Sequence, residues 1–490
     1  MFIFLIFLAT IIVAIASFFI KEKRDRFSTA FAGIFAVLVI IYSFVRFSSG
    51  YTGGFISRVS YSLAPSIGIN FTTGVSGFTD ALLILSVIVI FISTLIAEKK
   101  ELDRLMFSYI LTTEVGLIGV LISRDFLFFY IFWEVVLIPV YFMIAQFGKF
   151  RKESVGLKFF VYTHIGSVFL LLSIFAVYTY NFDKTGVLTF EIGSLMTNST
   201  FSYMPAFWRD FTIFGFLFAF LVKMPVFPLH SWLPDSYESA PYPATVILSG
   251  GLSLMGGLGL FGILLPVTQS LGTFVLSFLI GIGIVSLIYF ALAAMMQSSL
   301  KRMMALASAA SMGFVVLAFG AGGLETGYEK TLELSGGMFQ IVAHGLIMAF
   351  VFSALYFIKR STGKENIQEL GGIFRETPFL ASFLLAGLLA SLGLPGMAGF
   401  VGEFSVLVGS FQAIGWVILF VIFGMILTAS YHIWAAQRSL YGPYNENLGR
   451  IRDSGTYQTI VLGASLIVIL ILGIFPNLLF GLLTAYSGGL

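Results

Sequence analysis

The sequence predicts an all-α polytopic membrane protein with about 14 transmembrane helices. Of its 490 residues, 58% are hydrophobic and only 10% are charged. In a water-soluble domain, roughly a quarter of the residues are charged. The apolar residues recur in stretches of about 17 to 25 residues, the length that a helix needs to cross ~30 Å of hydrocarbon. Such stretches are too long for the strands of a membrane barrel.

The expected spans follow one another along the whole chain, with short polar loops between them. They cover residues 3–20, 28–47, 79–97, 105–122, 125–147, 157–180, 207–230, 243–266, 271–296, 303–322, 335–358, 377–408, 410–436 and 456–487. The basic cluster KEKRDR at residues 21–26 follows the first span. This order favours a retained anchor over a cleaved signal peptide. The longest polar stretches, near 48–78 and 181–206, contain no recognisable module.

The basic residues predict the side of the membrane that each loop faces. Of 27 Lys and Arg residues, 20 lie in loops after odd-numbered spans, six lie in the other loops, and the last is Lys223. Cytoplasmic loops carry the basic excess, so both termini are expected on the non-cytoplasmic side, in a prokaryotic plasma membrane. Topology and lipid contact account for the net charge of +3, and no nucleic-acid partner is expected.

Two spans are interrupted by helix-breaking residues, the seventh at VKMPVFP and the twelfth at SLGLPGMAGFVGEF. The breaks are marked by Pro225, Pro228, Pro395 and Gly396. Each break carries one ionisable residue, Lys223 in the first and Glu403 in the second. Transporters built from inverted repeats place broken helices at corresponding positions in their two halves. We therefore expect two inverted five-helix repeats, 105–266 and 271–436, flanked by helices in 1–104 and 456–490.

Lys223 and Glu134 are the first candidates for a proton path. A charged group at membrane depth is costly and by default marks an ion or proton route. For Lys223 the alternative is snorkelling from a helix end. Glu134, in FYIFWEVVLIPVYF, lies inside its own span and should face a partner. A Lys–Glu pair in a dry interior would act as a switch, or else as a static salt bridge between the fifth and seventh spans.

Further ionisable residues extend this set. Glu403 is a candidate terminal proton site, or alternatively a capping acid at the start of a half-helix. His344, in QIVAHGLIMAF, is a candidate relay, or a histidine satisfied by a hydroxyl. Glu114 would feed a proton channel or bond to a neighbouring threonine. Other candidate relays are His164 and His230. Asp80 and Asp125, at span ends, are expected to be interfacial.

Small residues are closely spaced in GGLSLMGGLGLFG at 250–262. Such spacing is typical of close helix packing. It does not indicate a phosphate loop, because no strand precedes it and no Lys-Ser/Thr ends it.

Long motifs between about residues 71 and 440 resemble the M-type (chain 4) antiporter-like subunit of proton-pumping NADH-quinone oxidoreductase, respiratory complex I. This subunit type lies within a superfamily with Mrp antiporters and membrane-bound hydrogenases. The motifs are SRDFLFFYIFWEVVLIPVYFMIAQFG, LKFFVYTHIGSVFLL, VKMPVFPLHSWLPDSYESAPYPATVILSGGL, LKRMMALASAASMGF, IVAHGLIMAF and LPGMAGFVGEFSVLVGSF.

The resemblance implies a fourteen-helix fold with inverted five-helix repeats and a row of buried ionisable groups at midplane height. It also implies roles for individual residues. The glutamate of FWE and the lysine of VKMP, here Glu134 and Lys223, form the pair coupled to proton entry. The acid of GEF, Glu403, serves the exit side, and the histidine of AHGL is His344.

Two positions depart from the family pattern, the first of them at the centre of the expected path. The family usually has a lysine in the eighth span, and Leu254 occupies the matching place in LSGGLSL. The family also usually has a histidine before MGF, and Ser311 occupies that position in this sequence. Leu254 exchanges no proton, so a path from Lys223 to Glu403 would need water, with Ser249, Ser253 or His344 as relays.

The sequence therefore favours a proton-translocating membrane-arm subunit of a complex I-type redox-driven pump. The alternatives are a subunit of a multi-subunit Na⁺/H⁺ antiporter or membrane-bound hydrogenase, and a non-pumping scaffold, which Leu254 favours. Without cysteine the chain holds no thiolate-ligated cluster. We expect no cofactor or metal in it. Fe-S clusters, flavin and quinone are expected in redox-arm partners, next to other antiporter-like and small membrane subunits.

Overall fold

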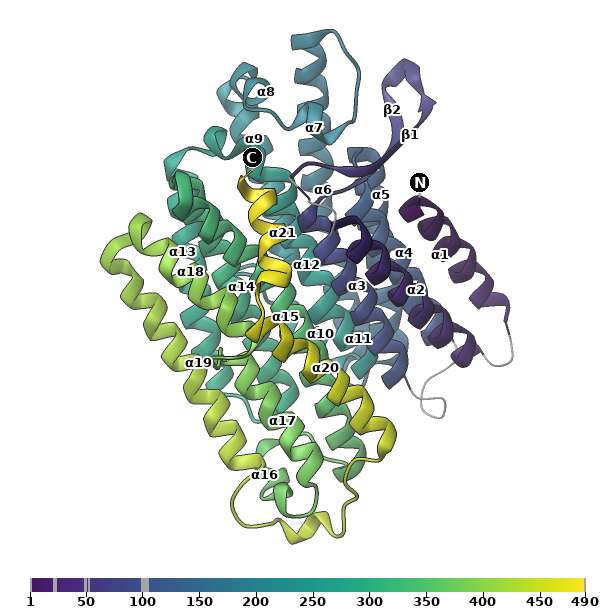
Figure 1. The fold of residues 1–490 in the computed structure, drawn as a ribbon, viewed down its shortest axis with the longest axis vertical. Helices are drawn as coiled ribbons and strands as arrows, with labels where there is room; N and C mark the ends of the chain where they lie inside the picture. The colour runs from purple at the N-terminus through teal and green to yellow at the C-terminus, as the bar shows by residue number, and fades with distance from the viewer. Residues whose placement is uncertain (1, 21–23, 48–50, 52, 98–104, 489–490) are drawn as a thin grey trace.

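The computed structural model describes residues 2–20, 24–47, 51, 53–97 and 105–488. Within them the chain forms a bundle of long helices and a two-stranded hairpin, and the two ends of the chain lie toward the same end of the bundle (Figure 1). Parts of two expected basic loops, residues 21–23 and 98–104, lie outside the described residues.

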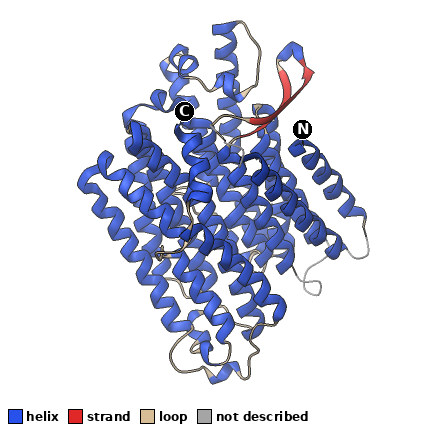
Figure 2. Cartoon of the chain, viewed as in Figure 1, coloured by secondary structure: helices blue, strands red, loops and turns tan. Residues whose placement is uncertain are grey.

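The N-terminal part places three helices around a β-hairpin. Its elements are α1 (Phe2–Phe19), α2 (Arg24–Phe47), β1 (Ile56–Ala64), the 3₁₀ turn η1 (Pro65–Ile67), β2 (Ile69–Val75) and α3 (Gly77–Ile96). The antiparallel strands, with Val59 opposite Thr73, lie at the end of the bundle that holds the termini (Figure 2). No module was predicted in this polar stretch. Its short alternating segment ISRVSYSLA nevertheless forms a strand, because it has a partner across the turn.

The next part runs through the first break. Its elements are α4 (Leu105–Ile122), α5 (Phe126–Phe147), α6 (Lys152–Thr185), α7 (Ile192–Leu195), α8 (Asn198–Tyr203), α9 (Ala206–Lys223), α10 (Leu233–Ser239), α11 (Tyr242–Ile247), the π-helix η2 (Leu248–Leu252), α12 (Ser253–Leu258), the π-helix η3 (Gly259–Leu264) and the 3₁₀ turn η4 (Leu265–Val267).

The remaining chain contains the second break. Its elements are α13 (Thr268–Met295), α14 (Leu300–Leu324), α15 (Gly327–Thr362), α16 (Ile367–Leu370), η5 (Ile373–Arg375), α17 (Pro378–Ser391), α18 (Ala398–Ile414), η6 (Gly415–Val417), α19 (Ile418–Ser439), η7 (Glu446–Leu448), α20 (Thr456–Ile474) and α21 (Asn477–Gly488).

Among the described residues, 11 helical stretches are long and apolar enough to cross a membrane. Two of these stretches, Tyr242–Met295 and Ala398–Ser439, join helices that the sequence analysis counted separately. Every expected span overlaps a helix, so the chain is a polytopic α-helical membrane protein, and the count of fourteen crossings stays a prediction.

The last expected span, 456–487, is not one continuous helix. It divides into α20 and α21 at Phe475 and Pro476. Proline has no N–H to donate and its ring clashes with the preceding turn, so a helix usually ends before it. The predicted single span is therefore wrong at this proline, although most of the residues around it are apolar.

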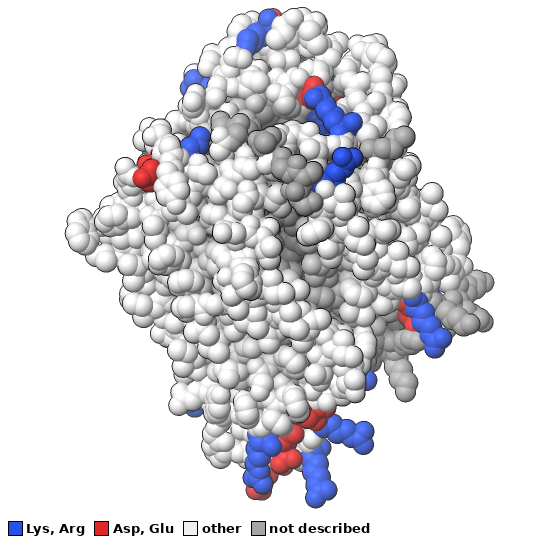
Figure 3. Space-filling view, in the orientation of Figure 1, with Lys and Arg blue, Asp and Glu red and all other residues white. Residues whose placement is uncertain are grey.

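The centre of the bundle is formed by α14 and α15, whose most apolar stretches are wholly buried. Peripheral helices such as α1 and α20 bury only 33% and 17% of theirs. On the face in Figure 3, charged side chains gather toward the two ends, and a broad zone of other residues separates them. This surface suits a hydrocarbon layer around the bundle.

Glycines in the eighth expected span allow a close helix contact beside the first break. A Cβ atom added to Gly256 would lie 2.4 Å from Cβ of Met224 and 2.8 Å from its backbone nitrogen. Neither of these Met224 atoms lies at the flexible end of the side chain, so neither could move aside easily. The small residues at 250–262 therefore serve packing, as predicted.

Gly256→Ala should destabilise the protein by about 1–3 kcal/mol, because the added methyl group forces α12 away from the end of α9. Gly281→Ala on α13 is the matched control, since its Cβ would meet nothing within 4 Å. The thermal unfolding midpoints of the two purified variants should differ clearly. Equal midpoints would contradict the close contact.

Candidate functional site

The first break replaces helical hydrogen bonds with specific partners. Lys223 is the last residue of α9, and residues 224–232, with Pro225 and Pro228, separate it from α10. The Trp232 indole N–H donates to the carbonyl of Val222 at 3.1 Å, and the Phe227 N–H donates to the Ser286 hydroxyl at 3.0 Å. Non-helical backbone at membrane depth needs such partners.

Lys223 is buried and its ammonium group has no hydrogen-bond partner among the described residues. Its Nζ lies 5.6 Å from the centre of the Trp133 ring, within the range of a cation–π contact. Trp133 itself is fully buried. The ammonium group therefore does not snorkel to the surface, and it is held at the inner end of a broken helix.

Glu134 lies beside Trp133 on α5, but it does not form the expected contact with Lys223. Its Oε2 lies 3.0 Å from Nδ1 of His164 on α6, and its Oε1 is buried with no partner among the described residues. No ion pair joins Glu134 and Lys223 in the described chain, although their charges attract at longer range. The static salt bridge considered above is therefore wrong, and His164 is a direct neighbour of Glu134.

The middle of the bundle is apolar at the position where the family pattern has a lysine. Leu254 is buried on α12, between the two π-helical segments η2 and η3. The hydroxyl groups of Ser249 and Ser253 donate to carbonyls of their own helix, those of Val246 and Ser249. Each hydroxyl oxygen keeps its capacity to accept a hydrogen bond.

His344 lies on α15 in the core of the second half. Its Nε2 is 3.1 Å from the hydroxyl of Ser308 on α14, and its Nδ1 has no partner among the described residues. The hydroxyl therefore satisfies only one ring nitrogen. Ser311, at the other departure from the family pattern, donates to the carbonyl of Ala307.

The second break, residues 392–397, includes Pro395 and Gly396 and lies against Glu403. The Glu403 side chain is buried on α18, beyond the first turn, and no side chain caps this helix. The alternative of a capping acid is therefore wrong. A Cβ atom at Gly393 would lie 2.5 Å from Glu403 Oε2, so the carboxylate packs on the backbone of the break. Gln340 of α15 lies beside it.

Glu114 and His230 lie in different surroundings. Both carboxylate oxygens of Glu114 are buried without partners in the part of the chain that the structure describes, and the hydroxyls of Thr112 and Thr113 donate instead to carbonyls of their own helix. His230 lies within the first break, where its ring contacts that of Phe290 edge-on at 4.7 Å. It does not end the first half-helix.

Three further ionisable groups are buried in the protein. Asp80 and Asp125 are almost completely buried, and their expected place at the membrane interface stays a prediction. Ser43 donates to Asp80, and Asp125 accepts from the Leu127 N–H as the cap of α5. Glu333 on α15 was not considered, because its span was expected to begin at residue 335. Its spacing of seven from Gln340 would have indicated a shared helix face.

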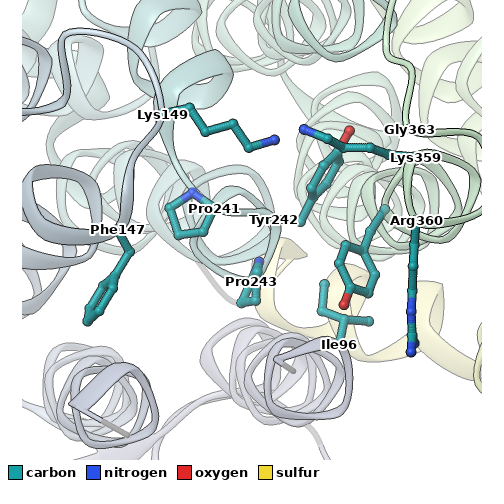
Figure 4. Close-up of a pocket in the computed structure, with 10 residues that line it drawn as sticks. Ile96, Phe147, Lys149, Pro241, Tyr242, Pro243, Lys359, Arg360 and Gly363 are labelled. Carbon is teal, nitrogen blue, oxygen red and sulfur yellow. The ribbon is translucent and has the colours of Figure 1, made fainter. Parts of the chain in front are cut away.

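A cavity of about 440 Å³ lies at the other end of α15, where basic residues gather. Lys149 and Lys359 extend toward Tyr242 from different segments (Figure 4). Both ammonium groups bind Glu365 Oε1, at 3.2 and 2.6 Å, and the Tyr242 hydroxyl donates to the same atom at 2.9 Å. None of the expected site residues lines this cavity. The residues that line it come from both halves of the chain and lie outside the apolar zone.

No three His, Cys, Asp or Glu side chains within the described ranges are grouped as a metal ion would require. The chemistry that the arrangement offers is proton exchange. Buried carboxylates, an ammonium group and an imidazole are placed on both broken helices and on the helices between them.

Comparisons with known proteins agree with this geometry. Residues 123–428 match the family described as "NADH:quinone oxidoreductase/Mrp antiporter, TM". The F(420)H(2) dehydrogenase subunit M of Methanosarcina mazei is 37% identical over 96% of this chain and 94% of the relative. The NADH-quinone oxidoreductase subunit M of Rickettsia prowazekii is 30% identical over 93% and 91%. A chain of respiratory complex I from Thermus thermophilus has the same fold, with a TM-score of 0.84, 23% identity and 99% coverage of both chains.

The contact of Glu403 with the second break can be tested with two glycines. Gly393 and Gly396 both have positive φ, 77° and 91°, so alanine at either site costs about 1–2 kcal/mol of backbone strain. Only at Gly393 would the methyl group meet the carboxylate. Gly393→Ala should shift the infrared band of the Glu403 carboxyl group, and Gly396→Ala should leave it in place. A shift of the same size in both would contradict the contact.

Proposed function

The chain belongs to the NADH:quinone oxidoreductase/Mrp antiporter transmembrane family, and we propose that it moves protons across the membrane as an antiporter-like subunit of a redox-driven complex. The membership confirms the family resemblance seen in the motifs. The observation that carries the proposal is the set of ionisable groups at the two helix breaks, with buried Lys223 and half-buried Glu134 near the first and buried Glu403 at the second.

The proposed mechanism is electrostatic. When Glu134 approaches Lys223, the carboxylate stabilises the ammonium form and Lys223 takes up a proton. When Glu134 moves away, an uncompensated charge in the apolar interior is costly, and Lys223 gives up its proton toward the second half. The separated arrangement supports this cycle, because His164 offers the Glu134 carboxylate a partner away from Lys223.

The route across the second half must pass Leu254. We propose that water carries the proton past this side chain, with Ser249, Ser253 and His344 as relays. The two hydroxyl oxygens are able to accept a hydrogen bond from water, and His344 Nδ1 has no partner in the described chain. Glu403 receives the proton on the exit side. Glu114 and His230 are candidates for the entry side.

The topology belongs to the same proposal. The units 105–266 and 271–436 are inverted repeats, each with one broken helix, and 1–104 and 456–490 flank them. Both termini face away from the cytoplasm. The shared end of the two termini in Figure 1 and the 20 basic residues in alternate loops support this orientation.

The relatives named above carry names of multi-subunit dehydrogenases. We infer that this chain likewise assembles with other antiporter-like subunits, small membrane subunits and a redox arm that holds flavin, Fe-S clusters and quinone. A second candidate function is a subunit of a cation/proton antiporter or membrane-bound hydrogenase. The third candidate is a non-pumping scaffold, which the apolar Leu254 favours.

Lys223→Ala and Glu134→Gln should each abolish proton translocation through this chain, because either change removes one half of the switch. The measurement is the number of protons moved per electron pair in membrane vesicles that contain the whole complex. Lys364→Ala is the control, since Lys364 lies in an exposed ion pair with Glu369. Unchanged stoichiometry in both switch variants would support the scaffold.

The subunits that assemble with this chain should identify the reaction that drives proton translocation. A tagged chain extracted in mild detergent should co-purify with Fe-S or quinone-site subunits that peptide mass spectrometry identifies. Recovery of small membrane subunits alone would contradict the redox-driven proposal and support the antiporter.

A further inference from the structure

Glu333 is a buried carboxylate that the mechanism above does not use. It lies on α15, between the second break and the end of the bundle that holds the termini, and its side chain is fully buried. Oε1 accepts a hydrogen bond from the Ser410 hydroxyl of α18, and Oε2 has no partner among the described residues. A carboxylate left half satisfied in the interior is costly to keep.

The position of Glu333 continues a polar row along one face of α15. Glu333, Gln340 and His344 are spaced seven and four residues apart, so they share that face. On α18, Glu403 and Ser410 are also seven residues apart. Two turns of helix span about 10 Å. Gln340 lies beside Glu403, and Glu333 binds Ser410, so the two rows meet at two successive levels.

Glycines on α18 bring the two rows together. A Cβ atom at Gly402 would lie 2.3 Å from Gln340 Oε1, and one at Gly409 would lie 2.7 Å from the Cβ of Glu333. At both levels a small residue of α18 makes room for a polar side chain of α15. Larger residues at 402 and 409 would displace Gln340 and Glu333.

The row leads away from the basic end of α15. Lys359 lies near the C-terminal end of that helix, at the cavity of Figure 4. At the opposite end, Ser335 forms a 3.0 Å hydrogen bond with Ser487 of the C-terminal helix. Tyr328, in the first turn, is 73% exposed. Glu333 therefore lies between Glu403 and the surface on the side of the termini.

We propose that Glu333 is a further proton-carrying site, which takes the proton from Glu403 and releases it at the end of the bundle where the termini lie. This inference rests on the proposed function. The proton leaves the Glu403 carboxyl group, passes along water molecules beside Gln340 and adds to the Glu333 carboxylate. It then leaves Glu333 for the water outside, and both side chains return to their carboxylate forms.

The test replaces Glu333 with residues of equal size that do not titrate. Glu333→Gln keeps an oxygen that accepts the Ser410 hydrogen bond, so the helix contact should persist. The expected result is a loss of protons moved per electron pair equal to that of Lys223→Ala, in vesicles that contain the whole complex. Glu446→Gln is the matched control, because Glu446 is exposed in the connection after α19.

A second pair of variants separates titration from packing. Glu333→Asp and Glu333→Asn shorten the side chain equally, but only aspartate carries a proton reversibly. We expect Glu333→Asp to move more protons per electron pair than Glu333→Asn, while the two variants have equal thermal unfolding midpoints. During turnover, an infrared band of a protonated carboxyl group should appear in the wild type and be absent in Glu333→Gln.

The outcomes distinguish the two proposals. If Lys223→Ala stops translocation while Glu333→Gln and Glu333→Asn pump like the wild type, Glu333 is only a structural contact and the inference is overturned. If Lys223→Ala also pumps like the wild type, the proposed function itself fails. Equal loss with Asp and Asn would likewise overturn proton carriage by Glu333.

Discussion

Every part of this structure depends on the scarcity of hydrogen-bond partners in hydrocarbon. A helix satisfies its own backbone, so most of the chain is helical, and a break is tolerated only where other groups replace the lost bonds. At the first break, Trp232 and Ser286 provide them. At the second, the Leu394 N–H reaches the carbonyl of Leu389. Each break then offers a buried position next to non-helical backbone, and Lys223 and Glu403 occupy these positions.

The same constraint explains why the ionisable groups are not paired one to one. Lys223 faces Trp133, while Glu134 binds His164. A permanently closed Lys–Glu pair would lower the energy of one state only, and proton transfer needs two states of similar energy. The incomplete hydrogen bonding of the buried groups therefore supports the proposed proton transfer, and the buried side chain of Leu254 lies in the apolar region between the two breaks.

Ion pairs join the two halves outside the apolar zone, where charges are less costly. Glu365 joins two lysines and Tyr242. Arg302 binds both Asp235 and Glu238 at 3.1 and 2.6 Å. Inside each half, glycines hold helices together by packing, since Gly256 and Gly409 let neighbouring helices approach closely. The helices around the polar interior are therefore held together by packing. The ionisable groups between them are not needed for that purpose.

The sequence by itself determined the membrane class, the helix breaks at residues near 224 and 395, and the ionisable residues beside them. The length of an apolar stretch and the position of a proline are local features of the chain, so the sequence alone is enough to predict their effects. Only the tertiary structure decided that Glu134 contacts His164, that Asp80 and Asp125 are buried, that residues 56–75 form a hairpin and that Glu333 meets Ser410. Each of these depends on which helix face meets which neighbour, and that is set by packing between segments far apart in the chain.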